Sequence, residues 1–227
     1  MGHILSKAIT VVQLEIDNVE LYRGGKTILQ GVYLKATTGT ITAILGRNGN
    51  GKSSLLKVAF GQIQPKYKGV RLDGRLIRQP LYQTKKVKFL PQGSFLPGYL
   101  SLKRLFYLFK AEWDKFITLF PAFVGQQQER FKSLSGGQQR LVEIYCILTS
   151  KSEIVLLDEP FTHLAPVFVE SITQLIEEEK SKKIIILTDH NYDMVMHLAD
   201  QLYLMKNGAT SLVKNRDDLR RSGYISK

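Results

Sequence analysis

Apolar residues alternate with turn-forming residues along the first third of the chain. Three runs there read as strands, over residues 14–21, 27–36 and 40–45. Turn residues at Arg23-Gly24-Gly25 and Thr38-Gly39 separate these runs. Ser53 to Phe60 then has a helical pattern, and Val70 to Gly74 reads as a further strand and turn. The pattern predicts a β-rich N-terminal part with one early helix.

From Ser94 to Leu148 the strand signals stop, and large apolar residues recur at helical spacing. This stripe consists of Leu102, Leu105, Phe106, Phe109, Trp113, Phe116 and Phe120. Packing in a core is the simpler role for the stripe, although part of it could form a groove for a partner helix. The segment predicts a helical insert.

The last third of the chain alternates between strands and helices. Ile154 to Leu157 and Lys183 to Thr188 are largely apolar, which is typical of strands buried on both faces of a parallel sheet. Helical patterns follow them at 166–180 and 192–198, and a hairpin is expected around Asn207-Gly208. The expected fold is α/β, with a mainly parallel core sheet, an antiparallel N-terminal β subdomain and a short helical insert.

These elements suit one domain spanning residues 1–227. We expect its catalytic core to comprise residues 8–92 and 150–227, and its helical part to comprise 93–149. No apolar run approaches the roughly 18 residues of a transmembrane helix, and Met1 to Gln13 has too short an apolar core for a signal peptide. Cys146 is the sole cysteine, and its apolar neighbours predict a buried thiol in a reducing cytosol.

Lysine and arginine outnumber aspartate and glutamate by 32 to 20, which gives a net charge of +12. Short basic clusters lie at Lys85-Lys86-Lys88, Lys180-Lys182-Lys183 and Arg216-Arg220-Arg221. A solvated surface is the simplest interpretation, and proximity to an anionic membrane or binding of nucleic acid are the alternatives. Aromatic residues do not interleave these clusters, so nucleic acid is the least favoured of the three.

One segment has the spacing of a phosphate-binding loop, G-x-x-x-x-G-K-[ST]. It reads Gly46-Arg47-Asn48-Gly49-Asn50-Gly51-Lys52-Ser53, and we count the next residue, Ser54, among the binding residues. The loop lies between an expected strand and an expected helix, so its amides can face a triphosphate. Lys52 can reach the β- and γ-phosphates, and the Ser53 hydroxyl can ligate Mg²⁺. The motif predicts binding of a nucleoside triphosphate.

Two acidic residues, Asp158 and Glu159, follow the expected strand at 154–157. Ligands of parallel sheets bind at the carboxyl ends of the strands, where both residues would lie beside the phosphate-binding loop. Asp158 can hold the Mg²⁺ that bridges the phosphates, and Glu159 can polarise the attacking water. The two carboxylates are therefore expected to have different roles.

Between the loop and the acidic strand lies Leu134-Ser135-Gly136-Gly137-Gln138, which matches the L-S-G-G-Q signature of the ATP-binding cassette (ABC) ATPases. The chain resembles this family over almost its whole length, with Tyr22, Gln92 and His190 also in the family's order. The resemblance implies an ATPase that uses ATP and Mg²⁺. It further implies a head-to-tail dimer, in which Ser135, Gly136 and Gly137 of one cassette cap the γ-phosphate held by the partner's Lys52, and Gln138 is counted among the binding residues.

The same resemblance assigns roles to three more side chains. Tyr22 would stack on adenine, Gln92 would touch Mg²⁺ or water and link nucleotide state to the helical region, and His190 would contact the γ-phosphate and align Glu159. The structural alternatives are sheet packing for Tyr22, a solvent-facing turn for Gln92, and capping or core packing for His190. The expected catalytic residues are thus Glu159, His190 and Gln92, and the expected metal ligands are Ser53, Gln92 and Asp158.

The chain departs from the family pattern in three places. Ala165 stands where the family usually has an aspartate before proline, which affects the expected contact between cassettes. The helix after the signature has Tyr145-Cys146-Ile147 in place of A-R-A, which changes packing more than chemistry. The interval from Gln92 to Leu134 looks short for the family, so the surface for a docking partner should be small.

The favoured function is the energy-coupling ATPase subunit of an ABC transporter, cytoplasmic and peripheral on the inner face of the cell membrane. Its expected partners are a second cassette, identical or different, and a transmembrane permease subunit. One alternative is a soluble cassette ATPase acting on nucleic acid, ribosomes or an assembly complex, and another is a degenerate nucleotide-binding module, suggested by Ala165. The chain lacks the long coiled-coil insert of DNA-repair cassettes and the second ATPase unit of translation factors, so nucleic acid is not an expected partner.

Overall fold

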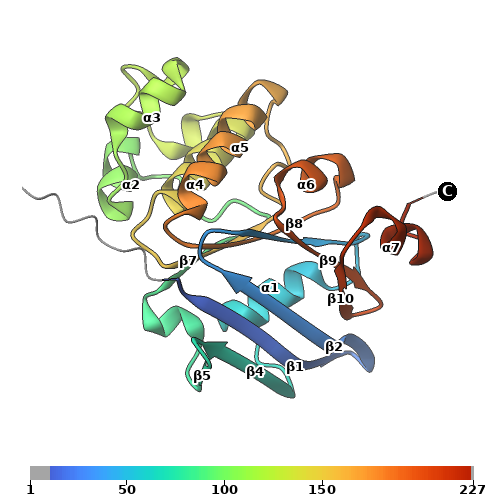
Figure 1. The fold of residues 1–227 in the computed structure, drawn as a ribbon. Coiled ribbons are helices and arrows are strands. Elements are labelled where there is room, and N and C mark those ends of the chain that lie inside the picture. Colours follow the sequence, from blue (N-terminus) through green and yellow to red (C-terminus); the bar gives the residue numbers. More distant parts are fainter. Residues whose placement is uncertain (1–10, 226–227) are drawn as a thin grey trace, which may run out of the picture.

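The computed structural model describes residues 11–225, which form two sheets with helices between and beside them (Figure 1). The first sheet is antiparallel and has the strand order β2-β1-β4-β5. Its strands are β1 (Gln13–Arg23), β2 (Lys26–Thr37), β4 (Tyr67–Leu72) and β5 (Arg75–Leu76). Buried and exposed positions alternate along β1, so the sheet offers one apolar face to the core.

The second sheet has the order β10-β9-β3-β8-β7-β6 and is parallel except for the edge strand β10. Its strands are β3 (Ile41–Leu45), β6 (Val87–Leu90), β7 (Ile154–Asp158), β8 (Ile184–Asp189), β9 (Gln201–Lys206) and β10 (Ala209–Val213). The register pairs Asp158 with Thr188 and Leu45 with Asp189. The carboxyl ends of β3, β7 and β8 therefore meet at one edge of the sheet.

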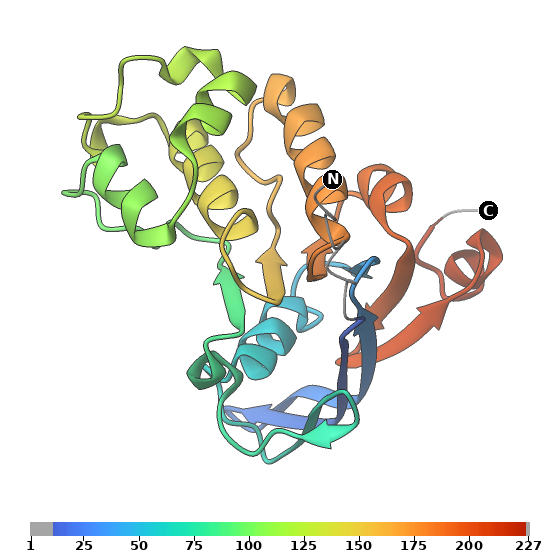
Figure 2. The same cartoon turned by 60° about the vertical axis from the view of Figure 1, so that its left-hand side comes forward.

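Helices cover both faces of the parallel sheet (Figures 1 and 2). One face carries α1 (Lys52–Phe60), which packs between the two sheets. The other face carries α4 (Gly136–Leu148), α5 (Pro166–Lys180) and α6 (Tyr192–Leu198), and α2 (Leu102–Phe109) and α3 (Trp113–Leu119) pack beyond α4. The remaining helical segments are α7 (Arg216–Arg221) and the 3-10 turns η1 (Leu81–Thr84), η2 (Pro121–Phe123) and η3 (Phe131–Ser133).

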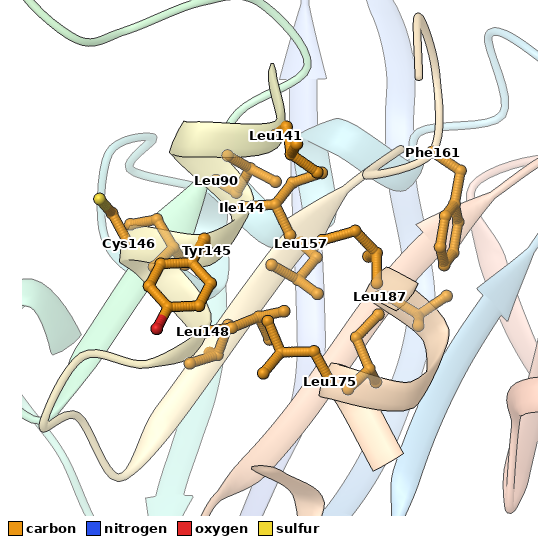
Figure 3. Packing of buried hydrophobic residues seen from close by; sticks show 14 of the residues in the cluster. Leu90, Leu141, Ile144, Tyr145, Cys146, Leu148, Leu157, Phe161, Leu175 and Leu187 are labelled. Atoms are coloured by element: carbon orange, nitrogen blue, oxygen red, sulfur yellow. The ribbon is translucent and has the colours of Figure 1, made fainter. Parts of the chain in front are cut away.

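Successive residues of the buried strands serve two different cores. Along β7, Val155 and Leu157 pack toward α4 and α5, whereas Ile154 and Leu156 pack toward α1. In Figure 3, Leu157 lies among leucine and isoleucine side chains of α4 and α5. Because side chains alternate across a strand, continuous apolar sequence is what a sheet covered on both faces requires.

The helical part has an aromatic core centred on Phe116. Its ring centroid lies 4.9 Å from those of Phe106 and Tyr145 and 4.8 Å from that of Phe123. The Tyr145 hydroxyl also donates to the Glu112 carbonyl at 2.9 Å. Most of the aromatic stripe thus packs internally, and Tyr145, one of the departures from the family pattern, fills this core.

Strand β6 and helix α7, like the two-residue strand β5, were missed in the sequence pattern. Strand β6 is four residues long and contains Lys88, so its apolar signal is weak. Helix α7 has six residues and depends on a capping box between Asn215 and Asp218 rather than on apolar periodicity. Apolar periodicity failed to predict β6 and α7 because both are short and are stabilised by contacts that do not appear as a repeat of apolar residues.

Several other expectations concern burial and membrane spans. Cys146 is buried and free, and burial raises the pKa of its thiol far above the ordinary value. Across residues 11–225, no helix is both long and apolar enough to cross a bilayer. The segment Met1 to Gln13, for which no signal peptide was expected, lies mostly outside the described residues.

Replacing Phe116 by alanine is expected to lower the free energy of unfolding by about 3–5 kcal/mol, because it removes the central ring of a closed aromatic cluster. The matched control is Tyr107→Ala on α2, whose side chain is exposed and should change stability by only about 0.5 kcal/mol. Urea denaturation of both variants measures the difference. Equal losses would contradict the central position of Phe116.

Candidate functional site

The loop between β3 and α1 is packed tightly at its two ends. A Cβ atom at Gly46 would lie 2.6 Å from the Met205 carbonyl oxygen. Gly51 has φ +103°, and a Cβ there would lie 2.8 Å from Leu29 Cδ2. These positions need glycine for space, and Gly51 needs it for its backbone conformation as well. The loop is thus fixed between β9 on one side and β2 on the other.

Lys52 is buried at the start of α1, with 4% of its surface exposed. Its ammonium donates to the carbonyl oxygens of Gly46 at 2.7 Å and Arg47 at 3.4 Å, and lies 3.9 Å from Glu159 Oε1. Burial lowers the pKa of Lys52, while the carboxylates of Glu159, Asp158 and Asp189 raise it. The side chain points back into the loop that precedes it, where it can reach a bound phosphate.

Asp158 lies beside the loop, at the end of β7. Its Oδ1 accepts hydrogen bonds from Ser53 Oγ at 3.0 Å and Thr188 Oγ1 at 2.7 Å. Its other oxygen, Oδ2, is buried and has no hydrogen-bond partner among the described residues. A buried carboxylate oxygen without a donor is costly, and it becomes a favourable ligand when a divalent cation is present.

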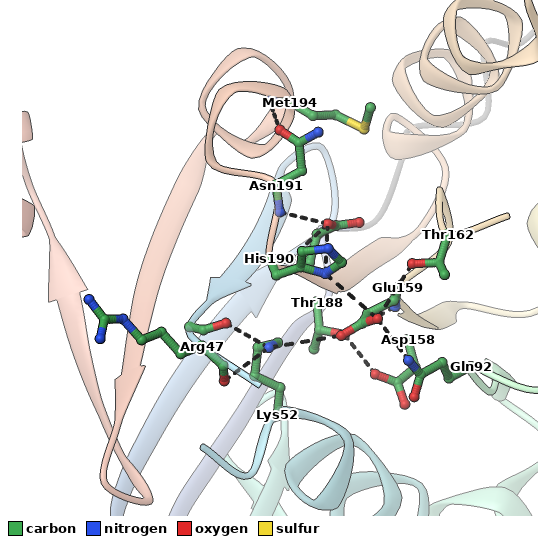
Figure 4. A network of polar contacts seen from close by, with 12 residues as sticks. Arg47, Lys52, Gln92, Asp158, Glu159, Thr162, Thr188, His190, Asn191 and Met194 are labelled. Atoms are coloured by element: carbon green, nitrogen blue, oxygen red, sulfur yellow. Dashed lines mark hydrogen bonds and ion pairs between the residues drawn. The ribbon is translucent and has the colours of Figure 1, made fainter. Parts of the chain in front are cut away.

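Glu159 sits at the centre of a polar network that Figure 4 shows. Its Oε2 accepts a hydrogen bond from Gln92 Nε2 at 2.8 Å and lies 3.7 Å from His190 Nδ1. Its backbone has φ +47°, which is uncommon for a residue other than glycine. Three residues that are distant in sequence, Lys52, Gln92 and His190, therefore converge on one carboxylate.

A turn after β8 positions His190. Asp189 Oδ1 accepts hydrogen bonds from the backbone N–H groups of His190 at 2.7 Å and Asn191 at 2.8 Å. The Asn191 side chain then caps α6 by accepting from the Met194 amide at 3.2 Å. The imidazole stays half exposed, with a side-chain exposure of 51%, so it can reach a molecule bound at the sheet edge.

The signature residues lie apart from this network. Ser135 and Gln138 form a capping box at the start of α4, and both hydrogen bonds stay within that turn. A Cβ atom at Gly137 would lie 3.1 Å from the His163 carbonyl oxygen. The segment thus presents glycine amides at a helix N-terminus, an arrangement that favours an anion.

Tyr22 occupies the end of the β1–β2 hairpin. It pairs with Thr27 in the register, close to Leu29, which contacts Gly51. Its hydroxyl donates to Glu20 at 3.2 Å, and Lys66 lies 5.8 Å from the ring centroid. The Tyr22 side chain is exposed, at 45%, and its role in stacking on adenine stays a prediction.

The other loop residues differ in their surroundings. Arg47, Asn48 and Gly49 are exposed, and Arg47 donates to the Gly223 carbonyl at 3.5 Å. Asn50 donates to the Met205 carbonyl at 3.1 Å, which anchors the loop to β9. Ser54 follows Ser53 on the first turn of α1. The central part of the loop is thus open to a ligand, and its two ends are fixed.

Thr188, Arg140 and Asp189 belong to this site and were missed in the sequence. Thr188 donates to Asp158 and accepts from the Glu159 amide at 3.2 Å, so it orients both acids. Arg140 donates to the carbonyls of Asp158 at 2.9 Å and Glu159 at 3.0 Å. The opposite charges Arg140 and Glu143, three residues apart and separated by the apolar Leu141 and Val142, were the signal that could have identified Arg140.

Comparison with known proteins agrees with this arrangement. A family model described as ABC transporter matches residues 29–162. The high-affinity branched-chain amino acid transport ATP-binding protein BraG of Pseudomonas aeruginosa is 29% identical over 208 residues, which cover 86% of this chain and 89% of BraG. The hemin import ATP-binding protein HmuV of the same organism is 27% identical over 227 residues, covering 92% and 89% of the two chains.

Solved structures confirm the expected fold. MJ1267, an ATP-binding cassette of an ABC transporter, superposes with a TM-score of 0.75 at 24% identity and covers 94% of this chain and 98% of its own. An ATP-binding subunit of an ABC transporter gives a TM-score of 0.77 at 21% identity, with 93% of both chains covered. At these identities the likeness concerns the fold alone.

Replacing Gly51 by alanine is expected to destabilise the protein more than replacing Gly49, although both have positive φ. Gly49→Ala should cost about 1–2 kcal/mol from its left-handed backbone, because its Cβ would meet open space. Gly51→Ala adds a further cost of about 1–3 kcal/mol, because the methyl group meets Leu29 and the Ile28 carbonyl. Denaturation without nucleotide measures both, and equal losses would contradict the tight packing at Gly51.

Proposed function

The chain belongs to the ABC transporter family as an ATP-binding and ATP-hydrolysing subunit, and we propose that the residues around Lys52 and Glu159 carry out the hydrolysis. The observation that supports this most directly is the convergence of Lys52, Gln92 and His190 on the Glu159 carboxylate. Residues 46–54 would bind the phosphates, with Tyr22 on the adenine. The core would comprise residues 8–92 and 150–227, with the helical part at 93–149.

The residues at the sheet edge fit a Mg²⁺ ion. Ser53 Oγ and Asp158 lie within 3.0 Å of each other, and Asp158 Oδ2 has no donor among the described residues. No cluster of three or more His, Cys, Asp or Glu suited to a metal occurs among residues 11–225, so most of the remaining ligands would be phosphate and water oxygens, the set that Mg²⁺ prefers in such sites. When bound, the ion would neutralise charge on the β- and γ-phosphate oxygens. Gln92 would reach the ion from the loop after β6.

Glu159 would take a proton from the attacking water. His190 Nδ1 and Gln92 Nε2 both face its Oε2, so the imidazole and the amide hold the carboxylate in one orientation. Lys52 faces the other oxygen at 3.9 Å and would shift toward the phosphates as ATP binds. Glu159 therefore acts as the general base and His190 aligns its carboxylate. Gln92, in the loop after β6, links the nucleotide state to the helical part.

The signature segment acts on a second cassette. The Ser135 and Gln138 side chains bond within their own turn, and the segment forms an anion-favouring helix N-terminus. A head-to-tail dimer, of identical or different cassettes, would place this helix end over the γ-phosphate at the partner's Lys52. The site is then complete only in the dimer.

A permease subunit would dock on a groove between the core and the helical part. The groove has a volume of about 1030 Å³ and is lined by five aromatic residues, which are Phe60, Tyr82, Phe89, Phe95 and Phe109. Lys57, Lys85 and Lys88 lie around them, and no acidic residue occurs in the described lining. Lys88 Nζ lies 5.7 Å from the Phe109 ring centroid. An apolar groove with three lysines suits an amphipathic helix that carries acidic residues.

The other basic clusters are largely neutralised by neighbouring acids. Lys180, Lys182 and Lys183 pair with Glu177, Asp200 and Glu179, with N–O distances between 2.6 and 3.2 Å. Arg220 and Arg221 on α7 pair with Asp217 and Asp218. Lys57, Lys85 and Lys88 around the groove, in contrast, have no ion-pair partner and no acidic neighbour in the described lining, which supports docking of an acidic segment there and so a peripheral position at the membrane next to the permease.

Glu159→Gln is expected to keep ATP binding but to lower turnover by about 10²–10⁴-fold, because the amide keeps the size of the side chain and loses its proton affinity. The variant should accumulate as an ATP-bound dimer in size-exclusion chromatography with ATP and Mg²⁺. Lys52→Ala serves as control, since it should bind no ATP and stay monomeric. A monomeric Glu159→Gln variant that binds ATP would contradict the shared site.

Reversing charge at the groove, with Lys85→Glu and Lys88→Glu together, is expected to abolish recovery of the permease when the complex is purified in mild detergent. Lys214→Glu, exposed and away from the groove, is the matched control. Once the permease has been recovered with the unaltered chain, lysine substitutions at the acidic positions of its docking helix should restore binding to the double variant. Retention of the permease by the double variant would contradict docking at this groove.

The same purification also tests the transporter function. Recovery of stoichiometric RNA or DNA with the unaltered chain, and of no membrane protein, would overturn that function.

A further inference from the structure

Helix α4 carries two buried charged residues, Arg140 and Glu143, between the groove and the catalytic carboxylate. Their exposed fractions are 5% and 1%, and Arg140 Nη1 lies 3.6 Å from Glu143 Oε2. The neighbouring positions of α4 are filled by apolar residues that pack in the core. Because a buried ion pair adds little net stability, its other hydrogen bonds are the better guide to its role.

Arg140 joins two loops that are far apart in sequence. Its Nη2 donates to the Asp158 and Glu159 carbonyls at 2.9 and 3.0 Å, and its Nε donates to the Pro160 carbonyl at 3.4 Å. Its Nη1 donates to the Pro91 carbonyl at 2.6 Å. A planar guanidinium with five N–H donors can hold several carbonyls at once, which a lysine ammonium cannot do in the same geometry.

Glu143 holds the segment that follows Gln92. Its Oε1 accepts hydrogen bonds from Ser94 Oγ at 2.7 Å, from the Phe95 amide at 2.9 Å and from the Leu96 amide at 3.4 Å. Phe95 lines the groove, as does Pro91, which Arg140 contacts. The pair therefore binds the groove wall on both sides of Gln92.

The same pair holds the backbone that aims Glu159. The positive φ of Glu159 is a conformation that persists only where surrounding contacts fix it. Arg140 contacts the carbonyls on either side of the Glu159 Cα atom, and Thr188 accepts from the Glu159 amide. Movement of α4 or of the groove wall would therefore change the direction of the catalytic carboxylate.

We propose that Arg140 and Glu143 are positioning residues that couple the groove to the catalytic base: they fix the segment around Gln92 and the backbone of Glu159 as one unit. Displacement of Pro91 or Phe95 by a docked helix is transmitted through the pair to the Glu159 carboxylate. The proposal rests on the assignment of Glu159 as the general base. It assigns the pair no contact with ATP.

The test uses the full chain with Arg140→Lys and Glu143→Gln, which preserve, respectively, the charge and the approximate shape of the side chains. Each should lower kcat for MgATP by about tenfold to a hundredfold, because a shift of about 1 Å in a reacting group costs about 10²-fold. KM should stay within about twofold, since the phosphate-binding loop is not altered. Arg220→Lys, which also alters an arginine paired three residues away along a helix, is the matched control.

Hydrogen exchange of backbone amides gives the second measurement and does not depend on turnover. Glu143 contacts the segment 94–96 and not Glu159, so faster exchange of the Glu159 amide in Glu143→Gln must be transmitted, either through Arg140 or through the segment around Gln92, whose side chain donates to Glu159. Reciprocally, Arg140→Lys should speed exchange of the Phe95 and Leu96 amides. A merely structural role would give a lower melting temperature with exchange changes confined to each residue's own contacts.

The outcomes separate this proposal from the proposed function. Exchange changes confined to local contacts, or unaltered kcat in both variants, would overturn the coupling while Glu159→Gln is still inactive. If Glu159→Gln hydrolyses ATP normally, the proposed base is wrong, and the exchange experiment alone decides whether the pair couples the two loops.

Discussion

A buried ammonium facing three carboxylates is the interaction on which the site depends. Lys52 is almost fully buried, and Asp158, Glu159 and Asp189 are each nine-tenths buried or more. Burying three carboxylates in one region is costly unless a cation compensates their charge. Removing one partner of such a buried set costs about 3–5 kcal/mol, since the remaining charges lose their compensation. Lys52 thus compensates the buried acids before nucleotide arrives, and ATP binding exchanges existing contacts for new ones.

Strand register brings these charges together. Parallel pairing of β7 with β8 and of β8 with β3 sets Asp158 beside Thr188 and Leu45 beside Asp189. A shift of one residue would turn the apolar side chains of each strand to the wrong face, so the two cores fix the register. Hydrophobic packing on both faces of the sheet therefore determines the electrostatics at its edge. The positions of the charged side chains in the site therefore depend on the packing of the two cores.

The phosphate-binding loop and the acid pair could be read from the sequence, because each is a contiguous motif beside a strand with a clear apolar signal. Thr188 and Arg140 could not be read in the same way. Thr188 matters through its register partner Asp158, and Arg140 through Pro91, which is 49 residues away. Their roles are long-range properties that local pattern does not encode. The fold was recognisable because its buried strands are continuous in hydrophobicity, whereas β6 and α7 are too short to stand out.

Helix α5 begins after Ala165 without a side-chain cap, with Pro166 at its first turn. In a dimer of identical chains, both composite sites would lack an acid at this position and would be equivalent. In a dimer with a different cassette that carries an acid there, the two sites would differ. Hydrolysis at one site would then not be equivalent to hydrolysis at the other. A single methyl group at one helix start thus bears on whether the transport cycle is symmetric.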